Sequence, residues 1–197
     1  MRVPFRVQAS NYDCVPTTIL NALSYLFDRS EIPPLAVQRV YLYCLDSVSG
    51  DRHFGHGTTE FAVRLLAEWF GNFKTKKFSS CWRYLSGDEV HLAQKNPIAT
   101  ALNTGGVVPL CVTDGGKGWH YILALQMDRD WLYAYDPYPR NARANKAKAY
   151  EYLVPENSNA PNVRISRAYM DTQTRKGRYR LGFYADREAV QIWRGDT

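Results

Sequence analysis

Three apolar runs between residues 107 and 137 constrain the fold more than any other feature of this sequence. They read VVPLCVT (107–113), HYILALQM (120–127) and WLYAYDP (131–137), and all three are rich in β-branched or aromatic residues, which favour strands. Two short polar segments, DGGKG (114–118) and DRD (128–130), separate the runs and are typical of hairpin turns. The sequence therefore predicts an antiparallel meander.

The chain before this meander follows a helical period instead. Apolar residues recur at helical spacing over 15–27, 35–46 and 58–71, and Pro97 begins a short fourth helix within 88–103.

Residues at the helix ends support these predictions. Asp13 is placed to cap the first helix and Pro16 fits its first turn, where a missing N–H costs nothing. Thr58 or Thr59 is expected to cap the third helix, and Gly71 to end it.

Strand patterns return after a segment rich in Pro, Asn and Lys (137–162), which we expect to form long loops. RYRLGFYA (178–185) and AVQIWR (189–194) are the further strand candidates. Helices come first and strands second, which predicts the α+β class. We expect one domain over 1–197, with a helical part about 1–105 and a sheet part about 106–197.

Charge and hydropathy limit the possible partners. The chain has 197 residues and a formal net charge of +6, with basic residues such as Arg143, Lys146 and Lys148 gathered after residue 139. A basic patch can bind nucleic acid, but no nucleic-acid motif accompanies it, so we interpret it as a solvated surface. No apolar run reaches the length of a membrane span and the first ten residues hold no secretory signal, which predicts a cytoplasmic protein with no membrane partner.

The four cysteines are too scattered for a zinc ribbon or a disulfide framework. Cys44 and Cys111 lie in apolar stretches and are expected to be buried, while Cys81 gives no clear signal. His53 and His56 form an HFGH pair without a nearby cluster of carboxylates or cysteines, which does not indicate a metal site. We therefore expect neither a metal nor an organic cofactor.

Cys14 differs from the other cysteines because it stands where a helix begins. The partial positive charge of a helix N-terminus stabilises a thiolate, and a nucleophilic cysteine also needs a base. Of the four histidines, His120 is the best candidate, since it opens one strand of the meander and Asp136 ends the next. An antiparallel hairpin places the two close together, and an acceptor beside the imidazole fixes its tautomer.

Gln8 precedes Cys14 by six positions. Its side-chain amide and the backbone N–H of Cys14 are suited to stabilise a tetrahedral oxyanion. The sequence therefore predicts a nucleophile, a base, an orienting carboxylate and an oxyanion donor in Cys14, His120, Asp136 and Gln8.

These residues, in this order, resemble the papain-like cysteine peptidases. The similarity is greatest to the bacterial branch that cleaves double-glycine leaders of bacteriocins, and to its stand-alone relatives. It rests on QASNYDCVPTT (8–18), GTTEFAVRLLAEWFG (57–71), VVPLCVTDGGKGWHYILAL (107–125) and YAYDPY (133–138), and spans roughly residues 5 to 140. The resemblance implies a papain-like fold, a peptide or protein substrate, and the four roles assigned above.

The chain departs from that pattern in two places. Val15 follows the cysteine where glycine is usual, and the basic region after residue 140 has no counterpart.

The same thioester chemistry serves a peptidase, an acyl or amide transferase and a deamidase, because the acceptor decides between them. A non-catalytic module that holds a peptide in the same groove is the remaining alternative. Trp119, next to His120, lines the substrate groove or packs in the core.

Overall fold

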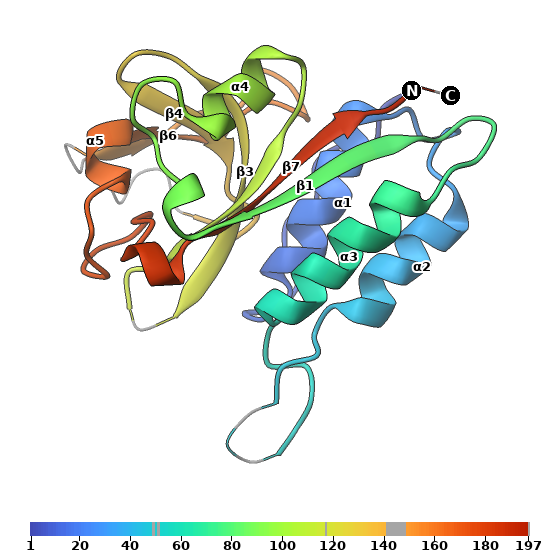
Figure 1. The fold of residues 1–197 in the computed structure, drawn as a ribbon, viewed down its shortest axis with the longest axis horizontal. Coiled ribbons are helices and arrows are strands. Elements are labelled where there is room, and N and C mark those ends of the chain that lie inside the picture. The colour runs from blue at the N-terminus through green and yellow to red at the C-terminus, as the bar shows by residue number, and fades with distance from the viewer. Residues whose placement is uncertain (49, 51, 117, 141–148, 197) are drawn as a thin grey trace.

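The protein, described here from a computed structural model, has an α+β fold in which three helices cover one face of an antiparallel sheet (Figure 1). The structure describes residues 1–48, 50, 52–116, 118–140 and 149–196. The predicted fold class is confirmed at this level, and the strand order is β1-β7-β2-β3-β4-β6-β5.

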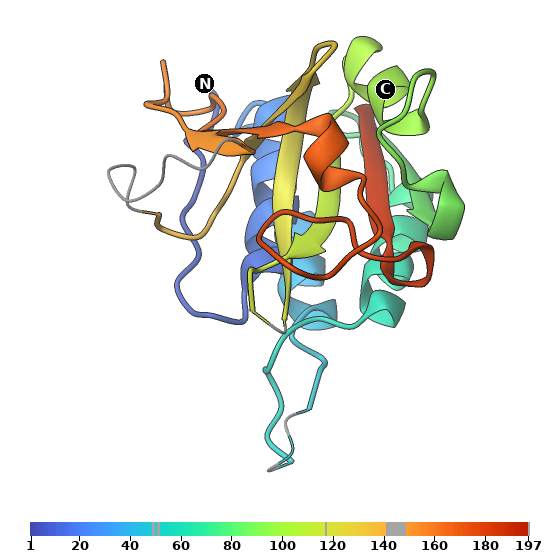
Figure 2. The same ribbon diagram turned by 90° about the vertical axis from the view of Figure 1, so that its left-hand side faces the viewer.

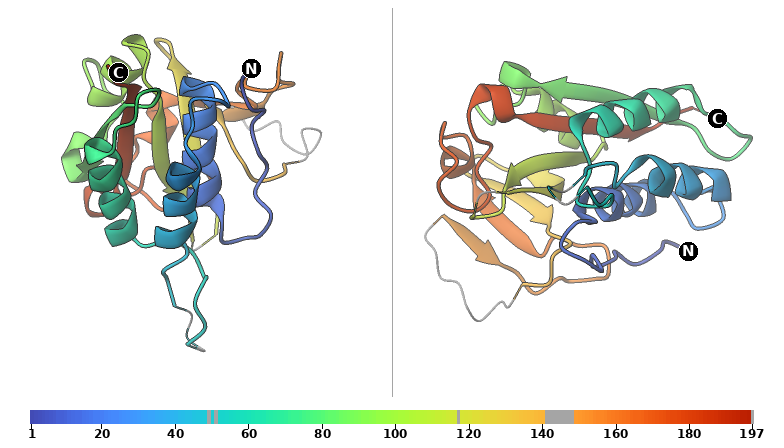
Figure 3. Two further views of the ribbon diagram at one scale, coloured as in Figure 1. Left: turned by 90° about the vertical axis from the view of Figure 1, so that its right-hand side faces the viewer. Right: turned by 90° about the horizontal axis from the view of Figure 1, so that it is seen from below.

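The helical layer consists of α1 (Cys14–Leu26), α2 (Pro34–Tyr43) and α3 (Glu60–Asn72), which lie side by side on the sheet (Figures 1 and 3). Their apolar faces and one face of the sheet enclose the first hydrophobic core, whose fully buried members include Leu23, Leu66 and Phe70. The connection between α2 and α3 projects away from the body of the molecule (Figure 2).

The sheet is formed by β1 (Ser80–Ser86), β2 (Val108–Thr113), β3 (Trp119–Met127), β4 (Trp131–Tyr135), β5 (Tyr150–Tyr152), β6 (Val163–Ser166) and β7 (Glu188–Arg194). Neighbouring strands are antiparallel throughout. The predicted meander is confirmed as β2, β3 and β4. All six residues of β2 are buried, as expected for a central strand covered on both faces.

The opposite face of the sheet carries α4 (Pro97–Asn103), α5 (Arg167–Met170) and the short 3₁₀ helices η1 (Gly87–Glu89) and η3 (Tyr184–Asp186). A second core lies on this side and includes Ile98, Ile122 and Tyr179. The chain thus buries both faces of its central strands, which holds the ends of β3 and β4 in fixed positions.

Several predicted boundaries were wrong. The second helix ends at Tyr43 rather than at residue 46, and Gly71 lies inside α3, which ends at Asn72. The helix at Pro97 and the Thr59 cap are confirmed, since the Thr59 hydroxyl accepts a hydrogen bond from the Ala62 N–H at 3.3 Å.

The strand predictions were incomplete. β1, β5 and β6 were not predicted, and β1 brings part of the supposed helical half into the sheet, where it pairs with β7 along its whole length. The predicted strand over 178–185 is not one: Tyr179 and Gly182 have positive φ angles there, and the segment ends in η3. The 189–194 prediction is confirmed as β7.

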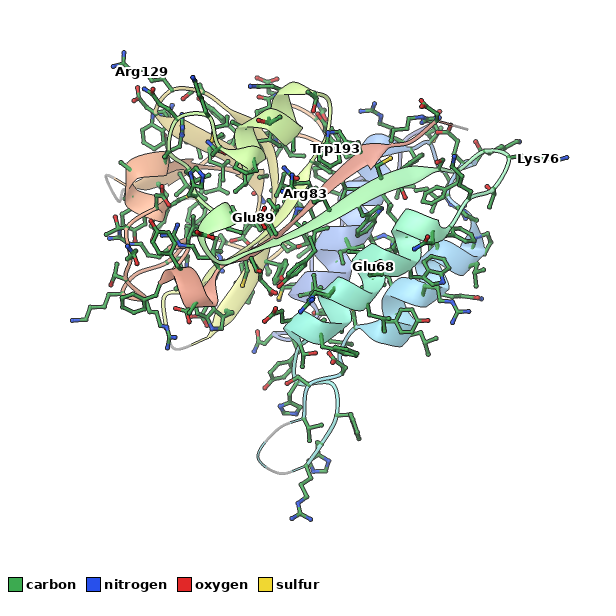
Figure 4. The ribbon with its side chains drawn as sticks, viewed as in Figure 1. Glu68, Lys76, Arg83, Glu89, Arg129 and Trp193 are labelled. Carbon is green, nitrogen blue, oxygen red and sulfur yellow. The ribbon has the colours of Figure 1, made fainter. Side chains whose placement is uncertain are left out.

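Edge strand β1 is protected by charge. Arg83 on β1 pairs with Glu89 of η1 at 2.7 Å, both labelled in Figure 4, and Lys76 stands at the tip of the turn from α3 into β1. Charged side chains at an edge discourage pairing with another chain.

Among the described residues, no helix combines the length and the apolar character that crossing a membrane requires.

Candidate functional site

Cys14 is the first residue of α1, and one hydrogen bond fixes its place against the sheet. The Thr18 hydroxyl donates to the Tyr121 carbonyl of β3 at 3.1 Å, deep in the core. Thr18 lies one turn after Cys14 on the same helix face, and His120 is the residue before Tyr121. This contact therefore docks the start of α1 beside the start of β3.

His120 and Asp136 form the closest contact of the site. The Nε2 atom of His120 lies 2.6 Å from Oδ1 of Asp136, and both side chains are almost completely buried. The predicted proximity is thus present.

A β-bulge makes this contact possible. The register between β3 and β4 shifts by one residue between Ala124 and Gln126. After the shift Leu123 pairs with Tyr135, so Asp136 follows on the face that carries His120. Without the shift Asp136 would point to the opposite face, because neighbouring residues of a strand alternate.

His120 also interacts with Cys14, and the two side chains line the same cleft. Burial lowers the pKa of His120, but the hydrogen bonds and charges of Asp136 and Cys14 outweigh it and raise the pKa to about 9. The site therefore favours an imidazolium beside a sulfur that can become its thiolate partner.

The Asp136 carboxylate accepts four hydrogen bonds. Oδ1 accepts hydrogen bonds from His120 and from the Tyr138 N–H (2.8 Å). Oδ2 accepts from Arg140 Nε (3.0 Å) and from the Tyr179 hydroxyl (2.5 Å). Burial raises the pKa of Asp136, but these partners, His120 foremost, outweigh burial and lower the pKa to about 2. Asp136 is therefore ionised at neutral pH.

Asn162 holds the backbone of Asp136 on both sides. Its Oδ1 accepts from the Asp136 N–H at 2.7 Å and its Nδ2 donates to the Asp136 carbonyl at 2.8 Å. Sequence reasoning missed Asn162, Arg140 and Tyr179. No motif marks them: Asn162 and Tyr179 reach Asp136 from distant parts of the chain, and Arg140 follows it by four residues.

Gln8 lies at the same end of α1. The backbone N–H of Gln8 donates to the carbonyl of Pro137 at 2.9 Å. Gln8 therefore lies beside the residue that follows Asp136. The side chain is buried, and Nε2 donates to the Ser10 carbonyl at 2.6 Å. One Nε2 hydrogen is so engaged, and the second is available for a group in the cleft.

Asp13 serves a different purpose from the one predicted. It occupies the N-cap position of α1, but its side chain makes no capping hydrogen bond. Instead its carboxylate accepts from the N–H groups of Ala9 (2.9 Å) and Ser10 (2.7 Å). Asp13 thus shapes the loop between Gln8 and Cys14 and leaves the N-terminal N–H groups of α1 available.

A cleft of about 1000 Å³ contains the three side chains of Gln8, Cys14 and His120. Trp119 and Tyr138 stand on its wall, and Trp119 is 39% exposed, which makes it a groove residue rather than a core residue. At the rim, the rings of His56 and Tyr12 lie 4.5 Å apart between centroids and are tilted by 32°. In the described part of the chain, no group of three or more His, Cys, Asp or Glu side chains is suited to hold a metal.

The other cysteines show how the site differs from an ordinary thiol environment. Burial raises the pKa of Cys44 to about 12 and raises that of Cys111 as well, so both remain inert thiols, and their predicted burial is confirmed. Cys81 is exposed on the edge strand. Only Cys14 has both a helix N-terminus and an imidazole partner among the cysteines, all four of which are described.

The nucleic-acid alternative rested on the basic residues Arg143, Lys146 and Lys148. These three lie outside the described residues.

Comparison with known proteins adds no relative: the sequence matches no protein-family model, and no curated protein gives a significant match.

Proposed function

We propose that this protein is a papain-like cysteine peptidase that cleaves a peptide or amide bond through a Cys14 thioester. The observation that carries the proposal is the chain of contacts from Cys14 through His120 to Asp136, closed by a 2.6 Å hydrogen bond in a buried setting. A buried structural cysteine has no need of such a partner.

In the proposed mechanism His120 takes the thiol proton, and the Cys14 sulfur attacks the substrate carbonyl carbon. The carbonyl oxygen becomes an oxyanion, which the Gln8 Nε2 and the Cys14 N–H stabilise. His120 then gives its proton to the leaving amine as the C–N bond breaks. Water, deprotonated by His120, attacks the thioester, releases the acid and restores the thiol.

Asp136 keeps the imidazole in one orientation throughout. As an ionised group with four donors, it stabilises the imidazolium without taking the proton itself. The open cleft suits an extended peptide chain. If an amine replaces water, the same thioester performs transfer, and if a glutamine side chain is the substrate, it performs deamidation.

Site-resolved alkylation across pH tests the proposal on the intact chain. Trace iodoacetamide labels the cysteines, and mass spectrometry locates the label in the wild type and in His120→Ala. We expect Cys14 to label selectively below pH 7 and to lose that advantage in the variant, because the imidazolium stabilises its thiolate.

Exposed Cys81 is the internal control, since its reactivity should follow that of an unpaired thiol in both proteins. A Cys14 that labels no faster than Cys81 would refute the catalytic proposal and leave the peptide-holding module as the better interpretation. A positive result justifies incubation with a peptide library. A substrate is then identified by a thioester adduct that forms on the wild type and is absent from Cys14→Ala.

A further inference from the structure

Tyr179 contacts the Asp136 carboxylate from a part of the chain that the resemblance to known peptidases does not cover. Its hydroxyl donates to Oδ2 of Asp136 at 2.5 Å, and its side chain is completely buried in the second core. The contact spans 43 residues of sequence. The C-terminal region therefore contributes directly to the surroundings of the site.

The backbone at Tyr179 adopts a conformation that an aromatic residue rarely takes. Its φ angle is +66°, in the left-handed region. Thr113, the last residue of β2, holds it there: the Thr113 carbonyl accepts from the Tyr179 N–H at 2.8 Å, and the Thr113 hydroxyl accepts from the Arg180 N–H at 2.9 Å. Conformations of this kind persist where the surroundings over-determine them, commonly at functional sites.

The two oxygens of Asp136 have different partners. Oδ1 faces His120 and the Tyr138 N–H, whereas Oδ2 is held by Tyr179 and Arg140. A carboxylate with Oδ2 anchored by two donors cannot rotate about its Cβ–Cγ bond, so Oδ1 remains directed at Nε2 of His120.

We propose that Tyr179 is a positioning residue of this site, which with Arg140 fixes Oδ2 of Asp136 so that Oδ1 stays directed at His120 and favours the imidazolium. Tyr179 acts through Asp136 and not on the substrate. The inference rests on the proposed function for its catalytic meaning, but the contact itself can be tested without any substrate.

Among the described residues, the charged and titratable groups around the His120–Asp136 pair are Cys14 from α1, Tyr135 at the end of β4, Tyr138 and Arg140 from the segment after β4, and Tyr179 with Tyr152 behind it. Burial and the Asp136 charge raise the pKa of Tyr179 far above its usual range. The phenol is therefore a protonated donor at every pH at which His120 titrates, and its contribution is constant across a titration.

The test measures the titration of His120 by NMR in the full chain labelled at its four histidines, with His120→Ala assigning the signal. Tyr179→Phe removes the hydroxyl and keeps the ring. Tyr152→Phe is the matched control, because its hydroxyl lies 3.4 Å from that of Tyr179 and makes no hydrogen bond with Asp136 in the described structure. We expect Tyr179→Phe to weaken proton binding by His120 about tenfold, which is about one pH unit, and Tyr152→Phe to leave it unchanged.

A purely structural role predicts a different result, in which both variants lose similar stability in urea and His120 titrates as in the wild type. That result would overturn the inference. If Tyr179→Phe does not fold, Arg140→Gln removes the other donor to Oδ2, together with a positive charge that opposes the imidazolium. Loss of that charge alone raises the His120 titration, so a lowered titration supports the Oδ2 anchor, and an unchanged or raised one refutes it. The proposed function fails separately, when His120→Ala leaves Cys14 alkylation unaltered.

Discussion

Gln8 is fixed at both its backbone and its side chain before any substrate arrives. Its N–H is bonded to Pro137 and its Nε2 to Ser10, while its Oε1 is buried and has no partner among the described residues. The bond to the Ser10 carbonyl determines which end of the amide carries the hydrogens. An amide placed in advance loses little entropy when an oxyanion forms, which is the condition for strong transition-state stabilisation.

Replacing Gln8 with alanine should therefore lower turnover and leave the thiol intact. We expect kcat to fall about 10²- to 10³-fold, as for removal of an oxyanion donor elsewhere, while KM and the rate of Cys14 alkylation at neutral pH change little. Turnover of a cleaved peptide and alkylation are measured on the same samples. A parallel loss of both would mean that Gln8 supports the loop and not the oxyanion.

At the scale of elements, α1 organises the N-terminal segment that carries Gln8. Asn21, completely buried on α1, accepts from the Arg6 N–H at 2.8 Å and donates to the Arg6 carbonyl at 2.9 Å, as a neighbouring strand would. The same helix thus positions the candidate nucleophile at its first residue and holds the segment that leads to the oxyanion donor.

The variant Asn21→Ala should destabilise the protein by about 2 to 3 kcal/mol, because two hydrogen bonds are lost and a buried backbone pair is left without partners. We also expect faster tryptic cleavage after Arg6. Urea unfolding and limited proteolysis measure the two effects. Asn72→Ala, which removes an exposed bond to the Glu68 carbonyl at the end of α3, is the control and should change neither by much.

The sequence predicted the helices and the meander because their patterns are local, and it missed elements that depend on distant partners. β1 has few buried residues and exists through its pairing with β7, about a hundred positions further along the chain. The alternating pattern of 178–185 is that of a strand, yet Tyr179 and Gly182 take left-handed backbones there. Non-local pairing and turn geometry overrode local propensity in both cases.

The candidate residues and the closeness of His120 to Asp136 were predictable from the sequence, but the details that create the contact were not. Cys14, His120, Asp136 and Gln8 come from spacing and residue type, and all four lie at one end of α1 and the meander. The bulge between Ala124 and Gln126, which turns Asp136 to the face of His120, leaves no sign in the sequence. The donors Tyr179 and Asn162 were likewise invisible, since tertiary contact alone brings them to Asp136, whereas Arg140 lies only four residues after Asp136 and carries no motif that marks it.

At the scale of the whole molecule, the cleft joins the helical layer to the sheet. Cys14 begins α1, His120 lies near the start of β3, and both line the cleft, while Asp136 directly follows β4 behind His120. The His120–Asp136 pair is buried, so its charges also affect the stability of the fold. The free energy of unfolding should therefore change with pH both where the ion pair forms and where it is lost.

The stabilisation due to the pair should be greatest between about pH 4 and 6.5. The folded-state pKa of His120, about 9, is above its ordinary 6.5, so its contribution is complete below 6.5 and is lost as pH rises through 9. The folded-state pKa of Asp136, about 2, is below its ordinary 3.8, so its contribution is present above 3.8 and is lost as pH falls through 2. Urea unfolding of wild type and Asp136→Asn should thus differ most near pH 5 and much less near pH 10. A difference that is constant across this range would show that Asn removes packing or hydrogen bonds but no ion pair, and that His120 is neutral in the folded protein.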